Sequence, residues 1–292
     1  MRPVPVAFHI GPLVVHTYGL GLAVTFWFAY RYFERRLRAQ GYPTEWVLGF
    51  FIWVLVAAIV GARAMHVLAT LPSYRSDPLQ VFAVWQGGLS SFGGLILAIP
   101  TGVVVARRRC PQLGFGRAMD LVAPVLAAAW SMGRLLGPQL MVAGGGHPTG
   151  QWFGMYYADQ VGRRLPVPIF QAIEDAAIFC VLIYVERRTI RRATATEGLT
   201  PMADARYPAG TVIGTGMTLW GIERVVDEKL WLAYPGQLGD VLVEAAGIAL
   251  AIAGVIVLLR ARSRWRHWED GAGSRAPDHR TPERPSAPAG VA

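Results

Sequence analysis

The chain has 292 residues, of which 53% are hydrophobic and only 16% are charged, and its formal net charge is +9. Soluble domains carry about 25% charged residues, so this composition and the mean hydropathy of +0.35 argue against a soluble domain. The basic residues lie at the ends of apolar runs, where they set topology and contact lipid headgroups, so we expect no nucleic-acid partner. Cys110 and Cys180 lack metal-ligand spacing and form no disulfide framework.

Seven apolar segments follow one another along the chain, most of them close to the length of about 20 residues that crosses a bilayer. They cover about residues 12–30, 46–68, 89–106, 118–137, 169–185, 209–226 and 241–259. Arginines follow the first segment instead of preceding it, which is the reverse of a cleaved signal peptide.

Arginine clusters follow the first, third, fifth and seventh segments, whereas the other connections carry few basic residues. Short loops rich in arginine and lysine stay in the cytoplasm. The pattern predicts an all-α membrane protein of about seven transmembrane helices, with the N-terminus outside and the C-terminus in the cytoplasm. Residues 1–268 form the membrane domain, the glycine-rich and aromatic segment 138–165 forms an external cap, and 269–292 form a disordered tail.

Ionisable residues inside the predicted helices or at their outer ends are candidates for function, because a charge within a bilayer costs roughly 3 kcal/mol or more unless it is paired or hydrated. They are Arg63, His66, Arg134, Glu174, Asp175, Glu223, Arg224, Asp227, Glu228 and Glu244. The alternative is structural, because such residues can also extend to the headgroups or pair with one another. Arg63, Arg134 and Arg224 all fall in the outer half of the membrane, where converging guanidinium groups would bind an anionic headgroup such as a phosphate.

Two glycine pairs bracket the start of the third segment, Gly87–Gly88 and Gly93–Gly94. Such pairs are typical of close helix packing. The alternative is a backbone left open for the close approach of a ligand.

Five stretches occur in an order and spacing that resemble the prolipoprotein diacylglyceryl transferase family. They are HTYGLGLAV around Tyr18, VGARAMHVL around Arg63, WQGGLSSFGGL, SMGRLLG with GHPTGQWFGMYY, and PVPIFQAIE leading into WGIERVVDE. The resemblance covers about residues 10–260. It implies an enzyme of the bacterial inner membrane that moves a diacylglyceryl group from phosphatidylglycerol to the lipobox cysteine of a prolipoprotein, without a cofactor or a metal.

The resemblance also implies roles for single residues. Arg134 matches the family's phosphatidylglycerol-binding arginine, Arg224 and Glu228 match its sixth-helix motif, and Tyr18 matches its first-helix tyrosine. We expect Arg134 and Arg224 to hold the phosphate and Glu228 to orient Arg224 from one helical turn away. Arg63, Gly93 and Gly94 complete the expected substrate-binding residues.

The chain departs from the family pattern at several positions. Phe92 stands where the family has a histidine proposed as the catalytic base, and phenylalanine cannot accept a proton. Gly137 and Pro138 replace an expected asparagine, and Phe170 and Gln171 replace a tyrosine and a glutamate. Each of these residues lies at a position of this sequence that matches a position of the family motif.

The identity of the base therefore stays open between His66, His147, Glu228 and a thiolate that forms without a base. His66 is our first choice because it shares a helix face with Arg63, and its alternative is a hydrogen-bonded structural histidine. The departures also allow a second function, in which a diverged relative binds lipid or a lipoprotein partner without turnover. A retinal protein is excluded, because Lys229 lies before the seventh segment and not inside it.

Overall fold

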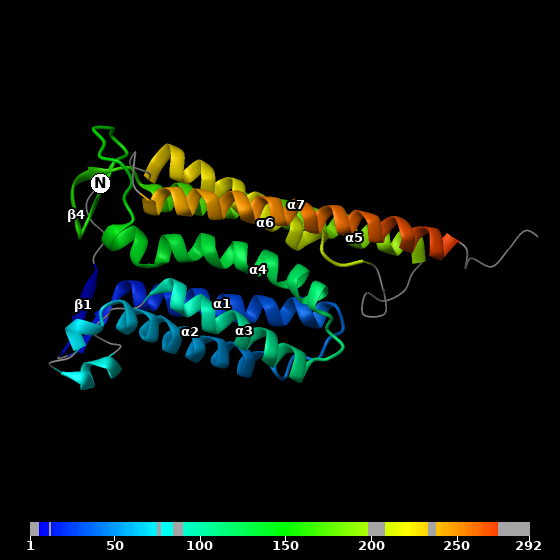
Figure 1. Ribbon diagram of the computed structural model, residues 1–292, viewed down its shortest axis with the longest axis horizontal. Coiled ribbons are helices and arrows are strands. Elements are labelled where there is room, and N and C mark those ends of the chain that lie inside the picture. The colour runs from blue at the N-terminus through cyan, green and yellow to red at the C-terminus, as the bar shows by residue number, and fades with distance from the viewer. Residues whose placement is uncertain are drawn as a thin grey trace, which may run out of the picture.

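The computed structural model describes residues 6–11, 13–74, 77–83, 90–197, 208–232 and 238–273. These residues form seven long helices that lie along the long axis of the molecule, each running opposite to the one before it (Figure 1). The helices are α1 (Thr17–Ala39), α2 (Val47–Ala69), α3 (Ser91–Arg109), α4 (Phe115–Leu136), α5 (Val167–Glu197), α6 (Thr211–Asp227) and α7 (Leu238–Gly273). The C-terminal ends of α2, α4 and α6 therefore lie at one end of the bundle, on the left of Figure 1.

Short elements gather at that same end. They are the hairpin β1 (Ala7–Ile10) and β2 (Leu13–His16), the 3-10 helices η1 (Leu71–Tyr74) and η2 (Pro78–Phe82), the π-helices η4 (Gln139–Ala143) and η5 (Glu228–Leu232), and the hairpin β3 (Met155–Tyr157) and β4 (Gln160–Arg164). The sequence did not predict β1 and β2. Gly11 has a φ of 60° in their turn, and the pairing of Leu13–His16 with Ala7–Ile10 delays the start of α1 to Thr17.

Among the described residues, four helices are long and apolar enough to cross a membrane, over Val47–Ala69, Phe115–Leu136, Val167–Ala195 and Asp240–Gly271. Helix α6 has 17 residues, and α1 and α3 carry arginines in their last turns. Large apolar side chains such as Ile52, Trp53 and Val60 on α2 point outward, as they do in a helix that faces lipid. The predicted all-α, multi-pass membrane protein is thus confirmed, while seven crossings and their orientation stay predictions.

The helices pack in pairs through glycines. A Cβ atom on Gly61 of α2 would lie 2.2 Å from the carbonyl oxygen of Gly93 on α3, and one on Gly93 would lie 2.2 Å from that of Gly61. Helices α6 and α7 meet in the same way, because a Cβ on Gly221 would lie 2.5 Å from the carbonyl oxygen of Gly247. Small residues therefore let these backbones approach closely.

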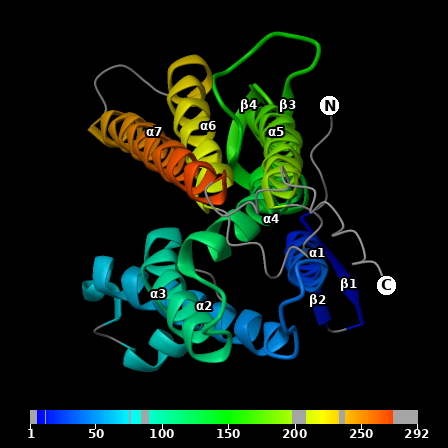
Figure 2. The same cartoon turned by 90° about the vertical axis from the view of Figure 1, so that its right-hand side faces the viewer.

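Helix α4 occupies the centre of the bundle, between the α2–α3 pair and the α6–α7 pair in the end-on view (Figure 2). It contacts α1, α5 and α6. One buried apolar cluster lies where α1, α2 and α4 meet, around Phe33, Leu37 and Leu121, and a second joins α4, α5 and α6 around Leu182 and Trp220. The central position of α4 brings its side chains against α5 and α6, where the candidate site lies.

Helices α5 and α7 extend beyond the apolar segments predicted for them, to 197 and 273 in place of 185 and 259. Arginine and glutamate are good helix formers, so the charged sequence continues each helix. The extensions also contact each other, because Arg192 forms a two-bonded ion pair with Glu269 at 2.6 Å and lies over the ring of Trp265. Helix α7 thus continues past the predicted start of the tail at 269, and residues 274–292 lie outside the described part.

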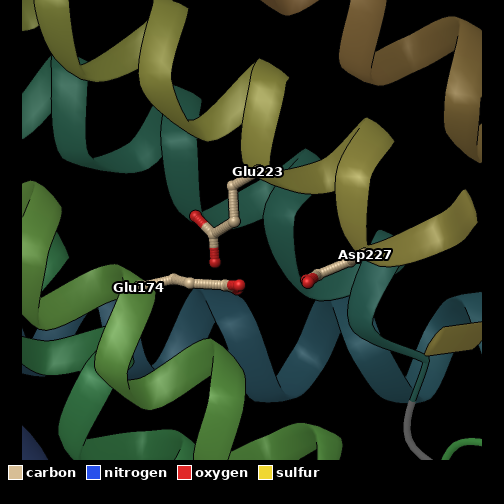
Figure 3. Close-up of side chains that lie close together, drawn as sticks. All are labelled: Glu174, Glu223 and Asp227. Carbon is tan, nitrogen blue, oxygen red and sulfur yellow. The ribbon is translucent and has the colours of Figure 1, made fainter. Parts of the chain in front are cut away.

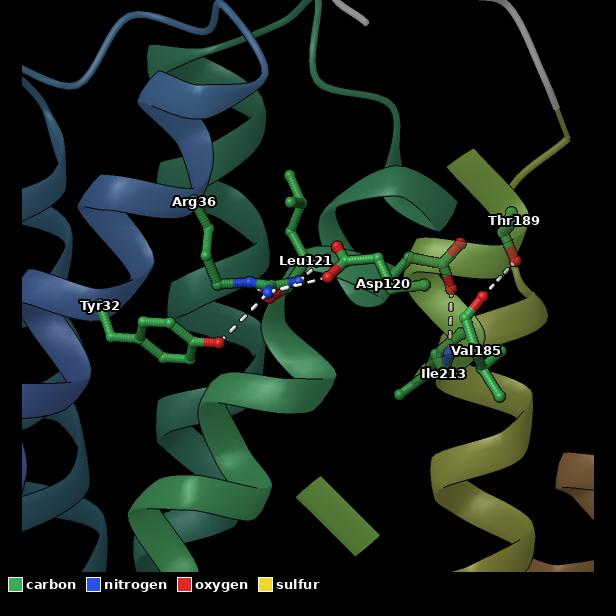
Figure 4. Close-up of polar contacts among 8 residues, drawn as sticks. Tyr32, Arg36, Asp120, Leu121, Val185, Thr189 and Ile213 are labelled. Carbon is green, nitrogen blue, oxygen red and sulfur yellow. Dashed lines mark hydrogen bonds and ion pairs between the residues drawn. The ribbon is translucent and has the colours of Figure 1, made fainter. Parts of the chain in front are cut away.

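Polar contacts also fix the helices at a distance from the site (Figure 4). Arg36 on α1 donates to Glu186 on α5 at 2.6 and 3.0 Å and to the carbonyl oxygen of Leu121 on α4 at 3.0 Å. Asp120 on α4 accepts hydrogen bonds from the backbone amides of Gly210 and Ile213 at 2.7 and 2.9 Å, which caps the first turn of α6. These contacts set the rotation of α1, α5 and α6 around α4.

Candidate functional site

Arg134 lies in the last turn of α4 and faces α5 and the segment that follows α4. Its Nη1 donates to the side-chain oxygen of Gln139 at 2.9 Å, and its Nε lies 3.9 Å from Oδ2 of Asp175. The Nε is buried and has no hydrogen-bond partner among the described residues. An arginine has five N–H donors in a planar fork, and this side chain is 24% exposed, so donors other than the buried Nε can reach an anionic ligand.

Four carboxyl groups lie beside Arg134, on α5 and α6. We call Glu174, Asp175, Glu223 and Asp227 the acidic cluster. Ligand oxygens of Glu174, Glu223 and Asp227 all lie within 4.8 Å of one another. Figure 3 shows these three side chains pointing toward one another from the two helices. The arrangement concentrates negative charge within the bundle.

Helical spacing places these acids on facing surfaces. On α5, Gln171, Glu174 and Asp175 are three and four residues apart, and on α6 Glu223 and Asp227 are four apart, so each set shares one face of its helix. Gln171 donates from Nε2 to Oδ2 of Asp227 at 2.6 Å, and Trp220 donates to Oδ1 of Asp175 at 3.3 Å. Asp175 and Asp227 are each 1% exposed.

Arg224 and Glu228 form an ion pair at the C-terminal end of α6. The Nη2 of Arg224 donates to Oε2 of Glu228 at 2.5 Å, and the two are four residues apart. This confirms the predicted contact between them. The Arg224 side chain is 34% exposed, whereas that of Glu228 is 4% exposed, so Glu228 holds the arginine from the buried side.

Arg63 is 7% exposed and is bound to the chain that follows α2. Its Nε donates to the carbonyl oxygen of Val81 at 2.8 Å, its Nη2 donates to that of Gln80, and its guanidinium lies 5.4 Å from the centre of the Tyr74 ring. His66 is half-buried, with its ring centre 6.3 Å from that of Tyr74 in an edge-to-face contact. Arg63 and His66, which share a face of α2, both contact the ring of Tyr74.

The three arginines expected to share one phosphate therefore contact three different sets of groups. Arg63 contacts the η1–η2 segment, Arg134 contacts Gln139 and Asp175, and Arg224 contacts Glu228. All three belong to helix ends on the same side of the bundle (Figure 1). Their convergence on a single headgroup stays a prediction.

The remaining expected site residues lie at the helix ends as well. Tyr18, in the first turn of α1, is half-buried and its ring centre lies 5.2 Å from that of His16. Gly93 and Gly94 are buried against α2, since Cβ atoms on them would lie 2.2 Å from the carbonyl oxygen of Gly61 and 3.3 Å from that of Ala58. This confirms the packing interpretation of that glycine pair. Gly87, Gly88 and the side chain of Phe92 lie outside the described part.

Phe170 joins an aromatic group between α5, the cap and η5. Its ring centre lies 5.1 Å from that of Trp231 and 6.4 Å from that of Phe153. The cap is also tied to η5 through its backbone, because the amide of His147 donates to the carbonyl oxygen of Trp231 at 3.1 Å. Phe170 thus makes apolar contacts that join α5 to the cap and to η5.

The sequence identified each acid of the cluster separately and did not predict that they meet. The signal was present, because Gln171, Glu174 and Asp175 share one face of α5 while Glu223 and Asp227 share one face of α6. What the sequence does not contain is the rotation that turns these two faces toward each other.

Comparisons with known proteins agree on one family. The family model described as prolipoprotein diacylglyceryl transferase matches residues 5–259. Among similar proteins, the phosphatidylglycerol–prolipoprotein diacylglyceryl transferase of Azotobacter vinelandii is 34% identical over 67% of this chain and 74% of its own length. The proteins of that name from Tolumonas auensis and Geobacillus kaustophilus are 28% and 30% identical, over 65% and 63% of this chain and 74% and 71% of theirs.

The family match spans all seven described helices up to residue 259 and includes Arg134, Arg224 and Glu228. The chain belongs to the prolipoprotein diacylglyceryl transferase family.

Proposed function

We propose that this chain transfers the diacylglyceryl group of phosphatidylglycerol to the thiol of the lipobox cysteine of prolipoproteins, in the bacterial inner membrane. The observation that carries the proposal is Arg134, whose side chain lies in the last turn of α4 and is 24% exposed, so its guanidinium can reach a ligand. A phosphodiester supplies the planar pair of anionic oxygens that an arginine fork binds best.

The reaction needs positive charge where the leaving group forms. The cysteine sulfur attacks the carbon of the diacylglyceryl group that is bonded to a phosphate oxygen. The bond between that carbon and that oxygen breaks, and glycerol phosphate leaves with the bonding electrons. Arg134 and Arg224 would hold this anion, and positive charge aimed at the leaving oxygen lowers the barrier. Glu228 would orient Arg224, with which it is paired at 2.5 Å. Tyr18 and Arg63 would line the lipid site, with Gly93 and Gly94 placing α3 close against α2.

The thiol must lose its proton before or during the attack. With Phe92 in place of the family's histidine, we propose His66 as the acceptor. Its half-buried ring lies on the same helix as Arg63, near the end of the bundle that holds the arginines. Glu228 is the second candidate, although its carboxyl group is already engaged by Arg224.

The proposed function also implies a topology. We infer seven membrane crossings, with the N-terminus, the cap 138–165 and the end of the bundle that carries the arginines outside the cytoplasm. The arginine clusters after α1, α3, α5 and α7 would then face the cytoplasm. The partners are phosphatidylglycerol, the prolipoprotein signal peptide and the bilayer, with no nucleic acid.

The test is transfer from phosphatidylglycerol to a lipobox peptide by the purified protein in detergent. Arg134→Ala should lower the transfer rate by about a hundredfold or more, as loss of a charge-stabilising group does. Arg134→Lys keeps the charge without the fork and should fall in between. The matched control is Arg38→Ala, an arginine with a 63% exposed side chain near the C-terminal end of α1. Transfer that survives Arg134→Ala would refute this site.

The alternative is a relative that binds lipid or a lipoprotein without turnover. Phe92 favours it most, since it stands where the family pattern has a histidine, and Gly137 and Pro138 stand in place of one expected asparagine. A strain depleted of its own transferase separates the two functions, because a binding protein cannot restore the modification of lipoproteins.

A further inference from the structure

We infer that Gln139 positions and binds the phosphate of the lipid substrate together with Arg134. Its side-chain oxygen orients the guanidinium of Arg134, and its amide group donates a hydrogen bond to the same phosphate. Gln139 lies between the sequence stretches SMGRLLG and GHPTGQWFGMYY, so the family resemblance assigns it no role. The inference rests on the proposed function and adds a residue to the same site.

The break between α4 and η4 brings Gln139 back to Arg134. The two residues are five positions apart, a separation that places side chains on different faces of a continuous helix. Helix α4 ends just before Gly137, which has a φ of −93° and a ψ of −178°, and η4 begins after Pro138. Glycine is needed at this break, because a Cβ atom at Gly137 would collide with the carbonyl oxygen of Gly133. The chain therefore turns at Gly137, and the Gln139 side chain meets Arg134 across the end of α4.

The guanidinium of Arg134 is held on two edges. On the buried side its Nε lies 3.9 Å from Oδ2 of Asp175, which in turn accepts a hydrogen bond from Trp220 at 3.3 Å through Oδ1. On the exposed side its Nη1 donates to Oε1 of Gln139 at 2.9 Å. Its Nη2 forms no hydrogen bond with any described residue. Each terminal nitrogen carries two N–H groups, so Nη2 and the second N–H of Nη1 stay available for two phosphate oxygens.

The amide group of Gln139 has donors to spare. The side chain is exposed and its Oε1 accepts from Arg134, whereas its Nε2 forms no hydrogen bond within the described part of the chain. An amide nitrogen carries two N–H donors. Because Nε2 and Oε1 are bonded to the same carbon atom, a phosphate oxygen bound at Nη1 of Arg134 lies within reach of Nε2. The anion would thus receive hydrogen bonds from both side chains.

The neutrality of the Gln139 side chain distinguishes the surroundings of Arg134 from those of Arg224. Arg224 is paired with the carboxylate of Glu228, which offsets its positive charge. Gln139 orients Arg134 without a charge of its own, so it adds no negative charge beside the bound anion. A carboxylate in place of this amide would accept the same hydrogen bond from Nη1, but it would repel the phosphate. Substitution by glutamate therefore separates a binding role from a purely structural one.

The experiment compares wild type with Gln139→Leu and Gln139→Glu, as full-length proteins in detergent. It measures the dissociation constant for phosphatidylglycerol without peptide, and kcat and KM for transfer to a lipobox peptide. Gln139→Leu should raise the dissociation constant and KM by about tenfold, the usual effect of losing a hydrogen bond to a charged group, while kcat changes less. Gln139→Glu should raise both constants further than Gln139→Leu, because the new carboxylate repels the phosphate.

Gln112→Glu is the matched control. Gln112 is an exposed glutamine between α3 and α4, at the opposite end of the bundle from Gln139. The same added charge there should change binding and transfer by less than about twofold, because solvent and salt screen it from the site. Substitutions of the exposed Gln139 should leave the unfolding temperature nearly unchanged, and this measurement separates lost binding from lost folding.

The outcomes distinguish this inference from the proposed function. A Gln139→Glu variant that binds phosphatidylglycerol as tightly as wild type would mean that the side chain only supports Arg134, and it would overturn the inference. Equal KM values for wild type and Gln139→Leu would overturn it as well. Both results leave the proposed function standing, because wild type is active in each. Wild type that neither binds nor transfers phosphatidylglycerol would refute the proposed function, and this inference with it.

Discussion

Gln171 on α5 donates a 2.6 Å hydrogen bond to Asp227 on α6, and the two residues are 4% and 1% exposed. The contact joins two neighbouring helices at the acidic cluster. The amide of Gln171 on α5 thus meets a carboxyl group on the opposite helix.

Replacing Gln171 with leucine should lower the free energy of unfolding by about 1–3 kcal/mol, since it leaves a buried carboxyl oxygen without its donor. Thermal or denaturant unfolding in detergent measures the change. The double variant Gln171→Glu with Asp227→Asn exchanges the amide and the carboxyl group across the same contact. It should recover most of the stability that Gln171→Glu and Asp227→Asn each lose as single substitutions. A double variant no better than the sum of its single substitutions would argue against this pairing.

Gly61→Ala should separate α2 from α3. The new Cβ would lie 2.2 Å from the carbonyl oxygen of Gly93, and overpacking of this kind costs about 1–3 kcal/mol. Gly49→Ala on the same helix is the matched control, because a Cβ there meets nothing within 4 Å. It should leave the unfolding temperature unchanged or raise it slightly, since alanine favours helix over glycine. Equal effects of the two substitutions would contradict the close contact.

His66→Ala should lower kcat for diacylglyceryl transfer by about a hundredfold or more, the usual contribution of a positioned base. Glu228→Gln keeps an oxygen that can accept the hydrogen bond from Arg224 but cannot take up a proton efficiently. We expect it to raise KM for phosphatidylglycerol more than it lowers kcat. The reverse pattern, with kcat lost in Glu228→Gln and kept in His66→Ala, would move the base to Glu228.

Tyr157 in the cap is 3% exposed, and its hydroxyl has no hydrogen-bond partner among the described residues. Burial raises its pKa from 10.0 to about 12. The folded chain thus holds this proton more tightly than the unfolded chain. The contribution of the proton to the free energy of unfolding is therefore complete below about pH 10 and is lost as the pH rises toward about 12. Tyr157→Phe should remove this part of the alkaline decline.

At neutral pH the same substitution should raise the free energy of unfolding by about 1 kcal/mol, because it removes a buried hydroxyl without a partner. Unfolding followed at pH 7 and at pH 11 provides both measurements. A fall in stability at pH 7 would mean that the hydroxyl has a partner in solution.

The sequence by itself determined the class of the protein and the places where its helices lie. Runs of apolar residues and the arginines that end them are local features, and each predicted segment overlaps one of α1 to α7. The five motifs, in their order and spacing, together indicated the family, which the match over residues 5–259 confirms. The Arg224–Glu228 contact was predictable because both residues lie on one helix, one turn apart.

Apart from the Arg224–Glu228 pair, only the tertiary structure decided which charged residues meet. Arg63 contacts the carbonyl groups that follow its own helix, and Glu174, Glu223 and Asp227 come together across α5 and α6. Such contacts depend on how each helix is rotated about its axis and how closely its backbone approaches the next. Pairs such as Gly61 and Gly93, 32 positions apart in the numbering, set that approach jointly. The periodicity of a single helix does not encode it.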